Sequence, residues 1–215
     1  MQFFNCHTHQ SLVKEGVLDL VNQYPKEFDE KIAFYSIGIH PWYIEESSIA
    51  AELLVIEEKL QTANCLALGE CGLDKRIEVA FELQEKVFEQ QLLLAEKHQK
   101  PVIIHCVAAF QEVIAIAKKL KISVPLIIHG FSKNTQVAQR LLANGFYLSF
   151  GKYLLKNPEL ESVFQKIPDE RFFLETDTLS ESIEEVYALA AKYKNKSIIE
   201  LQATIAANFK NVFQR

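Results

Sequence analysis

The sequence predicts an α/β protein built on a parallel sheet, and two observations carry the prediction. Short apolar runs recur along the chain, and each is followed by a polar residue and then by an amphipathic, helix-like stretch. Near-continuous apolar strands are typical of parallel sheets that are buried on both faces. The repeated strand–helix order leaves two architectures, an open doubly wound sheet and a closed barrel.

Seven runs have the composition of strands, at residues 2–5, 33–39, 65–69, 102–104, 125–128, 146–150 and 172–174. Apolar residues at helical spacing predict helices over 81–99, 109–120, 135–143 and 183–194. Ser197 is expected to cap a last helix. Because a closed barrel has eight strands, the eighth is expected to be very short or missing.

Length and composition bound the class of protein. The 215 residues fit one domain, since α/β barrels of about 200–250 residues fold as a unit. Hydrophobic residues make up 49% and charged residues 24%, which excludes a disordered chain. The net charge of −5 argues against a protein that coats nucleic acid, although bound metal can supply local positive charge.

The sequence also indicates a compartment. The start lacks the basic and apolar regions of a signal peptide, and no apolar run approaches the roughly 20 residues of a membrane span. Cys6, Cys65, Cys71 and Cys106 show no CxxC spacing and lie in or beside apolar runs, so we expect reduced, buried thiols. We therefore expect a cytoplasmic protein with no membrane association, and no obligate protein partner is evident.

Polar residues with metal-binding side chains stand where the predicted strands end. Five of the six histidines do so, and only His98 falls near a helix end. In parallel α/β folds, sites are built at the carboxyl ends of the strands. Imidazole and carboxylate together suit a divalent transition metal. The residues are His7, His9, His40, Glu70, His105, His129 and Asp177.

The spacing of the first pair strengthens this prediction. Residues i and i+2 of a strand share a face, so His7 and His9 point to one place. A single histidine at a sheet margin is as often a satisfied polar residue, but chance does not explain the whole set. Dinucleotide-binding, phosphate-loop and serine-hydrolase motifs are absent from the sequence. We therefore interpret the set as a metal site.

The motifs HxH, GIHP, GExGLD, PVIIH, HGFS, GFYLSF and LETD follow one another in this order. Together they resemble the TatD family of metal-dependent hydrolases, over nearly the whole chain. The family belongs to the amidohydrolase superfamily and includes metal-dependent deoxyribonucleases. The resemblance implies a single TatD-like domain over residues 1–215, folded as a TIM-type (β/α) barrel with a divalent metal site at its C-terminal face.

The resemblance also implies a ligand set. His7, His9, Glu70 and Asp177 would hold one metal ion, and Glu70, His105 and His129 a second, with Glu70 bridging. Asp177 is the implied general base and Glu70 the implied bridging ligand. These two are the expected catalytic residues. Imidazole and carboxylate suit Zn, Mn, Fe, Co or Ni, whereas Mg is a poor resident ion that can still support activity in an assay.

Four further residues lie in the same motifs. His40 either orients substrate or caps the end of its strand, and Ser132 is expected to donate a hydrogen bond to a ligand or substrate. Asp74 either supports the metal ligands or, as we favour, caps the following helix. Glu175 is left out of the site, because it is expected to point away from the face of Thr176.

The sequence departs from the family pattern at four points. Asn5 replaces an Asp, and Val107 replaces an Arg that would suit a phosphate. After Asp177 the chain runs directly toward a helix, which leaves Glu184 and Glu185 at a more open and more negative rim. The chain is also short for a complete barrel.

The motifs and the implied metal ligands favour a hydrolase of phosphodiesters that uses a metal-activated water, with DNA ends or oligonucleotides as substrate, whereas the missing Arg and the negative rim argue against a phosphodiester. The alternative is a metal-dependent amidohydrolase that acts on an amide, a lactone or a small phosphoester, since the expected Arg is absent. A barrel that binds metal without catalysis is the third hypothesis, and the complete ligand set argues against it.

Overall fold

The computed structural model describes residues 2–10 and 14–214. Within them lie eight strands, and the order of the strands in the sheet is their order in the chain. The pairs whose register is resolved are parallel. The strands are β1 Phe3–Thr8, β2 Val17–Gln23, β3 Tyr35–Ile37, β4 Cys65–Asp74, β5 Val102–Val107, β6 Leu126–Ile128, β7 Tyr147–Phe150 and β8 Phe172–Leu174.

The eighth strand that was expected to be short or missing is present. It is β2, the second in the chain, which is seven residues long and pairs in parallel with β1. Parallel neighbours usually need a connection of about a dozen residues or more. Here residues 9–16 connect β1 to β2. No amphipathic stretch therefore follows the first strand, and the strand–helix rhythm used to find the others does not reveal β2.

Eight α-helices lie within the described residues, and four of them match the predicted ranges closely. They are α1 Ile49–Leu60, α2 Phe81–His98, α3 Phe110–Lys119, α4 Thr135–Ala143, α5 Lys152–Lys156, α6 Leu160–Phe164, α7 Ile183–Lys194 and α8 Ile198–Phe213. Three short 3-10 turns complete the elements, η1 Pro25–Glu27, η2 Pro41–Tyr43 and η3 Asp169–Arg171. The sequence analysis did not identify α1, α5 or α6.

Local side-chain chemistry sets where the last two helices begin. Ser182 starts α7 and Ser197 starts α8, and each forms a capping box with the glutamate three residues later. In such a box the serine oxygen and the glutamate satisfy backbone N–H groups that the helix leaves without partners. The predicted cap at Ser197 is confirmed. Asn134 caps α4 through the N–H of Val137.

The chain divides into two compact units, each with its own packing. Residues Met1–Val21 and Ile128–Arg215 form the first unit, in which α7 and α8 pack against β1. The Tyr187 hydroxyl of α7 lies 3.1 Å from both the N–H and the carbonyl oxygen of Phe4. The Phe4 ring meets the rings of Phe173, Phe209 and Phe213 edge to face. Aromatic packing thus fixes β1 and β8 against the C-terminal helix.

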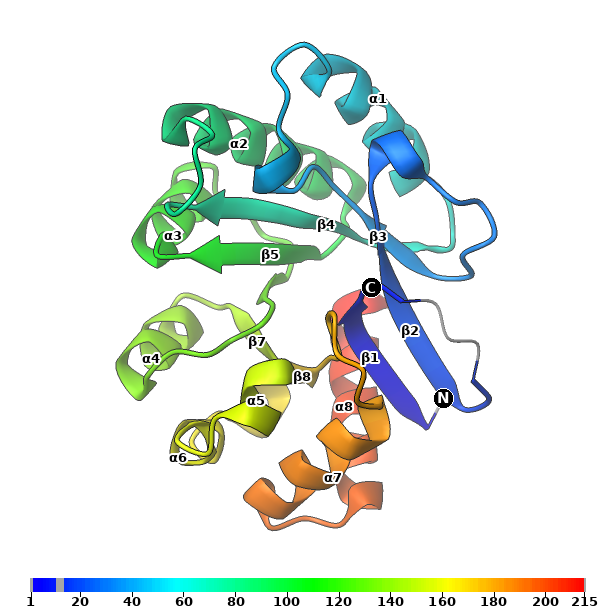
Figure 1. The fold of residues 1–215 in the computed structure, drawn as a ribbon, viewed down its shortest axis with the longest axis vertical. Helices are drawn as coiled ribbons and strands as arrows, with labels where there is room; N and C mark the ends of the chain where they lie inside the picture. Colours follow the sequence, from blue (N-terminus) through cyan, green and yellow to red (C-terminus); the bar gives the residue numbers. More distant parts are fainter. Residues whose placement is uncertain (1, 11–13, 215) are drawn as a thin grey trace. The chain divides into compact units, whose positions relative to one another are not determined.

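Residues Asn22–Ile127 form the second unit, where α1 and α2 pack on β4 and α3 packs on β5 (Figure 1). Two buried glutamines of α2 bind backbone at the end of β4 and just beyond the end of β3. Gln84 accepts from the Asp74 N–H at 2.8 Å, and Gln91 accepts from the Ile39 N–H at 2.7 Å. Residues seven apart lie on one helix face. A single face of α2 therefore fixes the backbone where the chain leaves β3 and β4.

Candidate metal centre

In the first unit, β1, the residue after β6 and the segment after β8 bring together four of the predicted ligands. The Asp177 N–H donates to the His7 carbonyl at 2.9 Å, and the His9 N–H donates to the Asp177 carbonyl at 3.1 Å. Asp177 Oδ1 lies 3.8 Å from His7 Nε2 and 3.5 Å from His9 Nε2. The His129 ring is centred 4.4 Å from the His7 ring. His7, His129 and Asp177 can offer ligand atoms that all lie within 4.8 Å of one another.

The backbone of Asp177 is itself unusual. Its φ is +54°, in the left-handed region that residues other than glycine seldom adopt. Such conformations cost about 1–3 kcal/mol and cluster at functional sites. The two backbone hydrogen bonds to His7 and His9 hold the residue in this conformation, and they keep its carboxylate beside both imidazoles.

Glu175 belongs to this group, although the sequence analysis left it out of the site. The side chain is completely buried, and Oε1 accepts from the Gly130 N–H at 2.6 Å. The same oxygen lies 3.6 Å from Nδ1 of His129. Burial raises the pKa of a carboxyl, but the contact with the His129 ring and the electrostatic influence of His129 and His7 outweigh it and hold the pKa of Glu175 below its usual value. A carboxylate on one ring nitrogen fixes an imidazole and directs the other nitrogen to a ligand.

In the second unit, β4, β5 and the turn after β3 bring together Glu70, His105 and His40. Glu70 Oε1 lies 2.9 Å from His105 Nδ1 and 3.1 Å from His40 Nε2. These three residues also form a group whose ligand atoms lie within 4.8 Å of one another. The Glu70 N–H donates to the Asn22 side chain at 2.6 Å, which fixes the backbone that carries the carboxylate.

The strands reach further than predicted, so several of these residues lie within strand ends rather than after them. β4 extends to Asp74 and includes Glu70, and β5 extends to Val107 and includes His105. Gly72 pairs with His105 across the two strands, and its φ is +146°. A Cβ at Gly72 would stand 2.0 Å from the His105 carbonyl oxygen, so only glycine fits here.

His40 and Asp74 each make polar contacts with more than one residue. His40 is buried, and Nδ1 accepts from the Trp42 N–H at 3.1 Å, while Nε2 faces Glu70. Asp74 does not cap α2, whose N-cap is Ala80. Its carboxylate accepts from the Trp42 indole and the Arg76 N–H at 2.8 Å each, and it lies 3.4 Å from His105 Nε2. These contacts outweigh the effect of burial and lower the pKa of Asp74.

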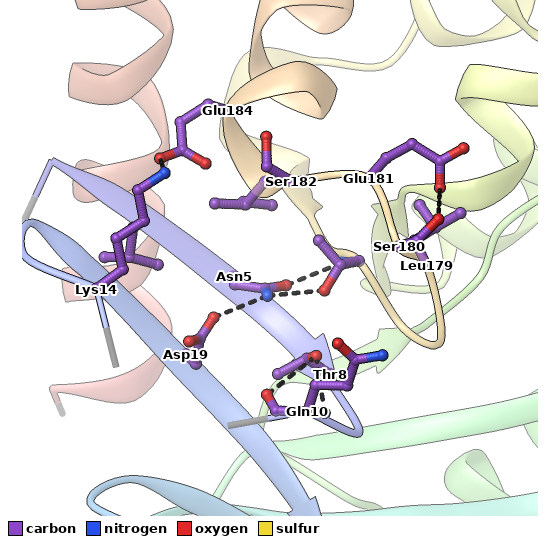
Figure 2. Close-up of a pocket in the computed structure, with 13 residues that line it drawn as sticks. Asn5, Thr8, Gln10, Lys14, Asp19, Leu179, Ser180, Glu181, Ser182 and Glu184 are labelled. Carbon is purple, nitrogen blue, oxygen red and sulfur yellow. Dashed lines mark hydrogen bonds and ion pairs between the residues drawn. The ribbon is translucent and has the colours of Figure 1, made fainter. Parts of the chain in front are cut away.

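The structure gives a physical account of Asn5. Its amide nitrogen donates to Asp19 and to the Thr176 hydroxyl at 2.9 Å each, and its oxygen accepts from the Thr176 N–H at 2.9 Å. Figure 2 shows the bonds that Asn5 makes here. Asn5 therefore ties β1 to β2 and to the residue before Asp177.

A pocket of about 150 Å³ opens at this place, lined by residues that include Asn5, Thr8, Lys14, Asp19 and Glu184 (Figure 2). Burial raises the pKa of Asp19, and the Asn5 hydrogen bond opposes the rise only in part. Glu184, which was expected to make the rim negative, forms an ion pair with Lys14. Glu185 is engaged in the capping box of α7.

Ser132 and the four cysteines complete the set of residues singled out in the sequence. Ser132 is half-buried in the segment between β6 and α4. Cys6, Cys65 and Cys71 are buried as expected, whereas Cys106 is half-buried. Burial raises the pKa of the Cys6 and Cys71 thiols, so neither is a ready nucleophile. No helix among residues 2–10 and 14–214 is both long and apolar enough to cross a bilayer.

Comparison with known proteins decides the family. The family model described as TatD related DNase matches residues 3–214. The chain belongs to the TatD family. A relative from Haemophilus influenzae, named an uncharacterized metal-dependent hydrolase, is 30% identical over 77% of this chain and 66% of its own length. The 3'-5' ssDNA/RNA exonuclease TatD of Erwinia tasmaniensis is 31% identical over 78% of this chain and 64% of its own length.

A solved TatD structure confirms the fold class. The TatD homologue YjjV of Escherichia coli K12 superposes with a TM-score of 0.85 at 20% identity, covering 100% of this chain and 98% of that one. With the strand order, this likeness confirms the predicted TIM-type (β/α) barrel. The matched segments span two thirds or less of the length of the two curated relatives named above.

Proposed function

We propose that this chain is a single TatD-type domain over residues 1–215 that hydrolyses phosphodiester bonds in single-stranded nucleic acid. The observation that carries the proposal is the group His7, His129 and Asp177, whose ligand atoms lie within 4.8 Å of one another. The name of the Erwinia tasmaniensis relative supports the substrate class. The cysteines, none of them in a disulfide, fit the reducing conditions of the cytoplasm.

The chemistry of the donor set fits divalent metal ions. Imidazole and carboxylate oxygen suit Zn, Mn, Fe, Co or Ni, and His-rich sites disfavour Mg. Buried carboxylates behind the histidines are the usual support for such ligands, and Glu175 and Asp74 stand in that position. We propose two ions, with ligands His7, His9, Glu70, His105, His129 and Asp177.

The protein groups have distinct tasks in the proposed reaction. Bound divalent ions supply Lewis acidity and lower the pKa of water toward neutrality. Asp177 Oδ1 takes the proton of the attacking water and then passes it to the leaving oxygen, so that one water and one phosphodiester give a phosphomonoester and an alcohol. His7 and His9 keep this carboxylate in place, and Glu70 is held by His40 and His105.

A second candidate function rests on Val107. An arginine at this point of β5 would grip a phosphate in two places, and valine provides no charge. A metal-dependent hydrolase of amides, lactones or small phosphoesters uses the same ligand groups without that grip. A barrel that binds metal and does not catalyse is the remaining outcome.

The test joins metal analysis with activity. Purified protein is analysed for metals and assayed on a labelled single-stranded oligonucleotide, a generic phosphodiester, an amide and a lactone. We expect about two ions per chain and cleavage of the oligonucleotide. His105→Ala should lose metal and activity, whereas His98→Ala, which changes a histidine paired with Glu57 near the end of α2, should keep both.

The outcomes separate the three functions. Asp177→Asn should lower kcat by roughly 10²–10⁴-fold, the usual contribution of a general base. Metal with cleavage of only the amide or lactone would support the second function. Metal without hydrolysis of any substrate would support the binding barrel, and protein that folds but takes up no metal would end the proposal.

A further inference from the structure

Two large aromatic side chains stand exposed directly after His40. Trp42 is 54% exposed and Tyr43 is 52% exposed, both on the 3-10 turn η2. Folding buries most tryptophan surface, because the indole is the largest apolar side chain. Trp42 is exposed on a turn that begins at His40, a candidate metal-site residue. This position favours a role in binding rather than in the core.

Trp42 is exposed but held in place. Its indole N–H donates to Asp74 Oδ2 at 2.8 Å, and its backbone N–H donates to His40 Nδ1 at 3.1 Å. Its ring meets the His40 ring nearly at right angles, with centroids 5.1 Å apart, and lies 5.9 Å from the His105 ring. A side chain already fixed in this way loses little conformational entropy when a ligand contacts it.

Tyr43 extends the same surface. Its ring lies 5.5 Å from the His40 ring and meets the Tyr24 ring edge to face at 5.2 Å. We call Trp42 and Tyr43 the aromatic ledge. The contacts named above lie within one compact unit, together with Glu70 and His105. We call His40, Glu70 and His105 the Glu70 group. A ligand on the aromatic ledge would therefore lie beside the Glu70 group.

The charge of the chain favours a stacking ligand. With a net charge of −5 and Val107 in place of an arginine, the protein has little electrostatic attraction for a phosphate backbone. Stacking of bases on aromatic rings supplies affinity that needs no positive charge and tolerates any base. In single strands the base faces are accessible, whereas in a duplex they are covered by their neighbours.

We propose that Trp42 is the platform on which a nucleobase of a single-stranded substrate stacks, placing the adjoining phosphodiester at the Glu70 group. Tyr43 borders the same base. The proposal rests on the proposed nuclease function and deepens it. It makes recognition depend on an unpaired base rather than on the sugar–phosphate chain.

The composition offers a direct test, because Trp42 is the only tryptophan in the chain. The metal-loaded protein is titrated with a short single-stranded oligonucleotide whose phosphorothioate linkages resist hydrolysis. Tryptophan emission is recorded together with the anisotropy of a label on the oligonucleotide. We expect the emission to be quenched in parallel with binding. An oligonucleotide of the same length and linkages without bases should bind more weakly and should not quench.

Substitutions separate stacking from a structural role. Trp42→Leu keeps apolar bulk and removes the aromatic face, and we expect Kd to rise about 5- to 150-fold, the range for one lost base stack. Trp42→Phe loses the bond to Asp74 but keeps a ring, so binding should be largely restored. Tyr153→Ala removes another exposed aromatic side chain, on α5, and should bind like the unchanged protein.

Each outcome decides the proposal. Cleavage and binding without quenching, or equal binding of the base-free oligonucleotide, would overturn the role of Trp42 and leave the nuclease function intact. Equal loss in Trp42→Leu and Trp42→Phe would show that the indole acts through Asp74 and not by stacking. Failure of the unchanged protein to bind or cleave any oligonucleotide would overturn both proposals.

Discussion

The side-chain amide of Gln91 forms both hydrogen bonds available at Ile39, accepting from its N–H at 2.7 Å and donating to its carbonyl at 3.1 Å. Ile39 precedes His40, so a helix side chain fixes the backbone that positions this imidazole. The two hydrogen bonds lie just beyond the end of β3, and they replace the bonds that a neighbouring strand would supply to Ile39.

Gln91→Leu should therefore be costly. The change leaves a buried N–H and a buried carbonyl without partners, and each such loss costs about 1–3 kcal/mol. We expect the free energy of unfolding, measured with urea, to fall by at least about 2 kcal/mol. Gln90→Leu, one position earlier on α2 and only half-buried, should change it far less. Equal effects of the two changes would contradict this account.

Gly72→Ala tests the close approach of β4 and β5. The added methyl would overlap the His105 carbonyl oxygen at 2.0 Å, so we expect a loss of more than about 3 kcal/mol in the free energy of unfolding. Gly145→Ala is the matched control, because its φ is also positive but nothing lies within 4 Å of the new methyl. It should cost only about 1–2 kcal/mol, for the backbone alone.

Asn5→Asp restores the residue that the family commonly has, and we expect it to destabilise this chain. The new carboxylate cannot donate to Asp19, which lies 2.9 Å from the Asn5 nitrogen, and adds a like charge beside it. A loss of about 1–3 kcal/mol at pH 7 is expected in urea unfolding. The exchanged pair, Asn5→Asp with Asp19→Asn, should recover most of it, and no recovery would exclude a pairwise cause.

Glu96 links α2 to the segment before β6, and it should make stability depend on acid pH. Its carboxylate accepts from the N–H groups of Ser123 at 2.7 Å and Val124 at 3.3 Å. Burial raises the pKa of Glu96, but the bonds from Ser123 and Val124 outweigh it, so the pKa in the folded protein lies below its usual value. The stabilisation is complete above the unfolded pKa of about 4.3 and is lost as the pH falls through the lower folded value.

The measurement compares Glu96→Gln with the unchanged protein across pH. At pH 7 the variant should be less stable by about 1 kcal/mol, and the difference should shrink below about pH 4. Glu78→Gln, at an exposed loop position, should differ by less than about 0.5 kcal/mol at every pH. A difference for Glu96→Gln that persists at low pH would exclude the carboxylate as its source.

Much of this architecture was readable from the residues, because strands buried on both faces leave uniform apolar runs. The helices at Thr135–Ala143 and Ile183–Lys194 were predicted at their observed bounds. β2 was missed because Asp19 and Asn22 interrupt its apolar pattern and no amphipathic stretch separates it from β1. α1 was missed because it is apolar around most of its circumference, so its periodicity is weak.

The residues that gather in the candidate site could be named from the sequence, and their binding of metal stays a prediction. The residues that support them were harder to find. Histidines and acids at strand ends are visible in a sequence, since the strands mark where they stand. Glu175, Gln84 and Gln91 act through contacts with His129, Asp74 and Ile39, and the residues beside them in the sequence do not reveal these partners. A glutamine on the otherwise apolar face of α2 was the one available sign, because a buried amide requires partners.

Gln84 and Gln91 of α2 also affect local unfolding near the candidate site. The Ile39 and Asp74 amides are protected by side chains of this helix. Their hydrogens should therefore exchange with solvent at similar rates, set by the unfolding of α2, although 35 positions separate them in the chain. The turns that carry Trp42 and Arg76 would then unfold together as one cooperative unit. The rate would be set by α2, a helix that contributes no metal ligand of its own.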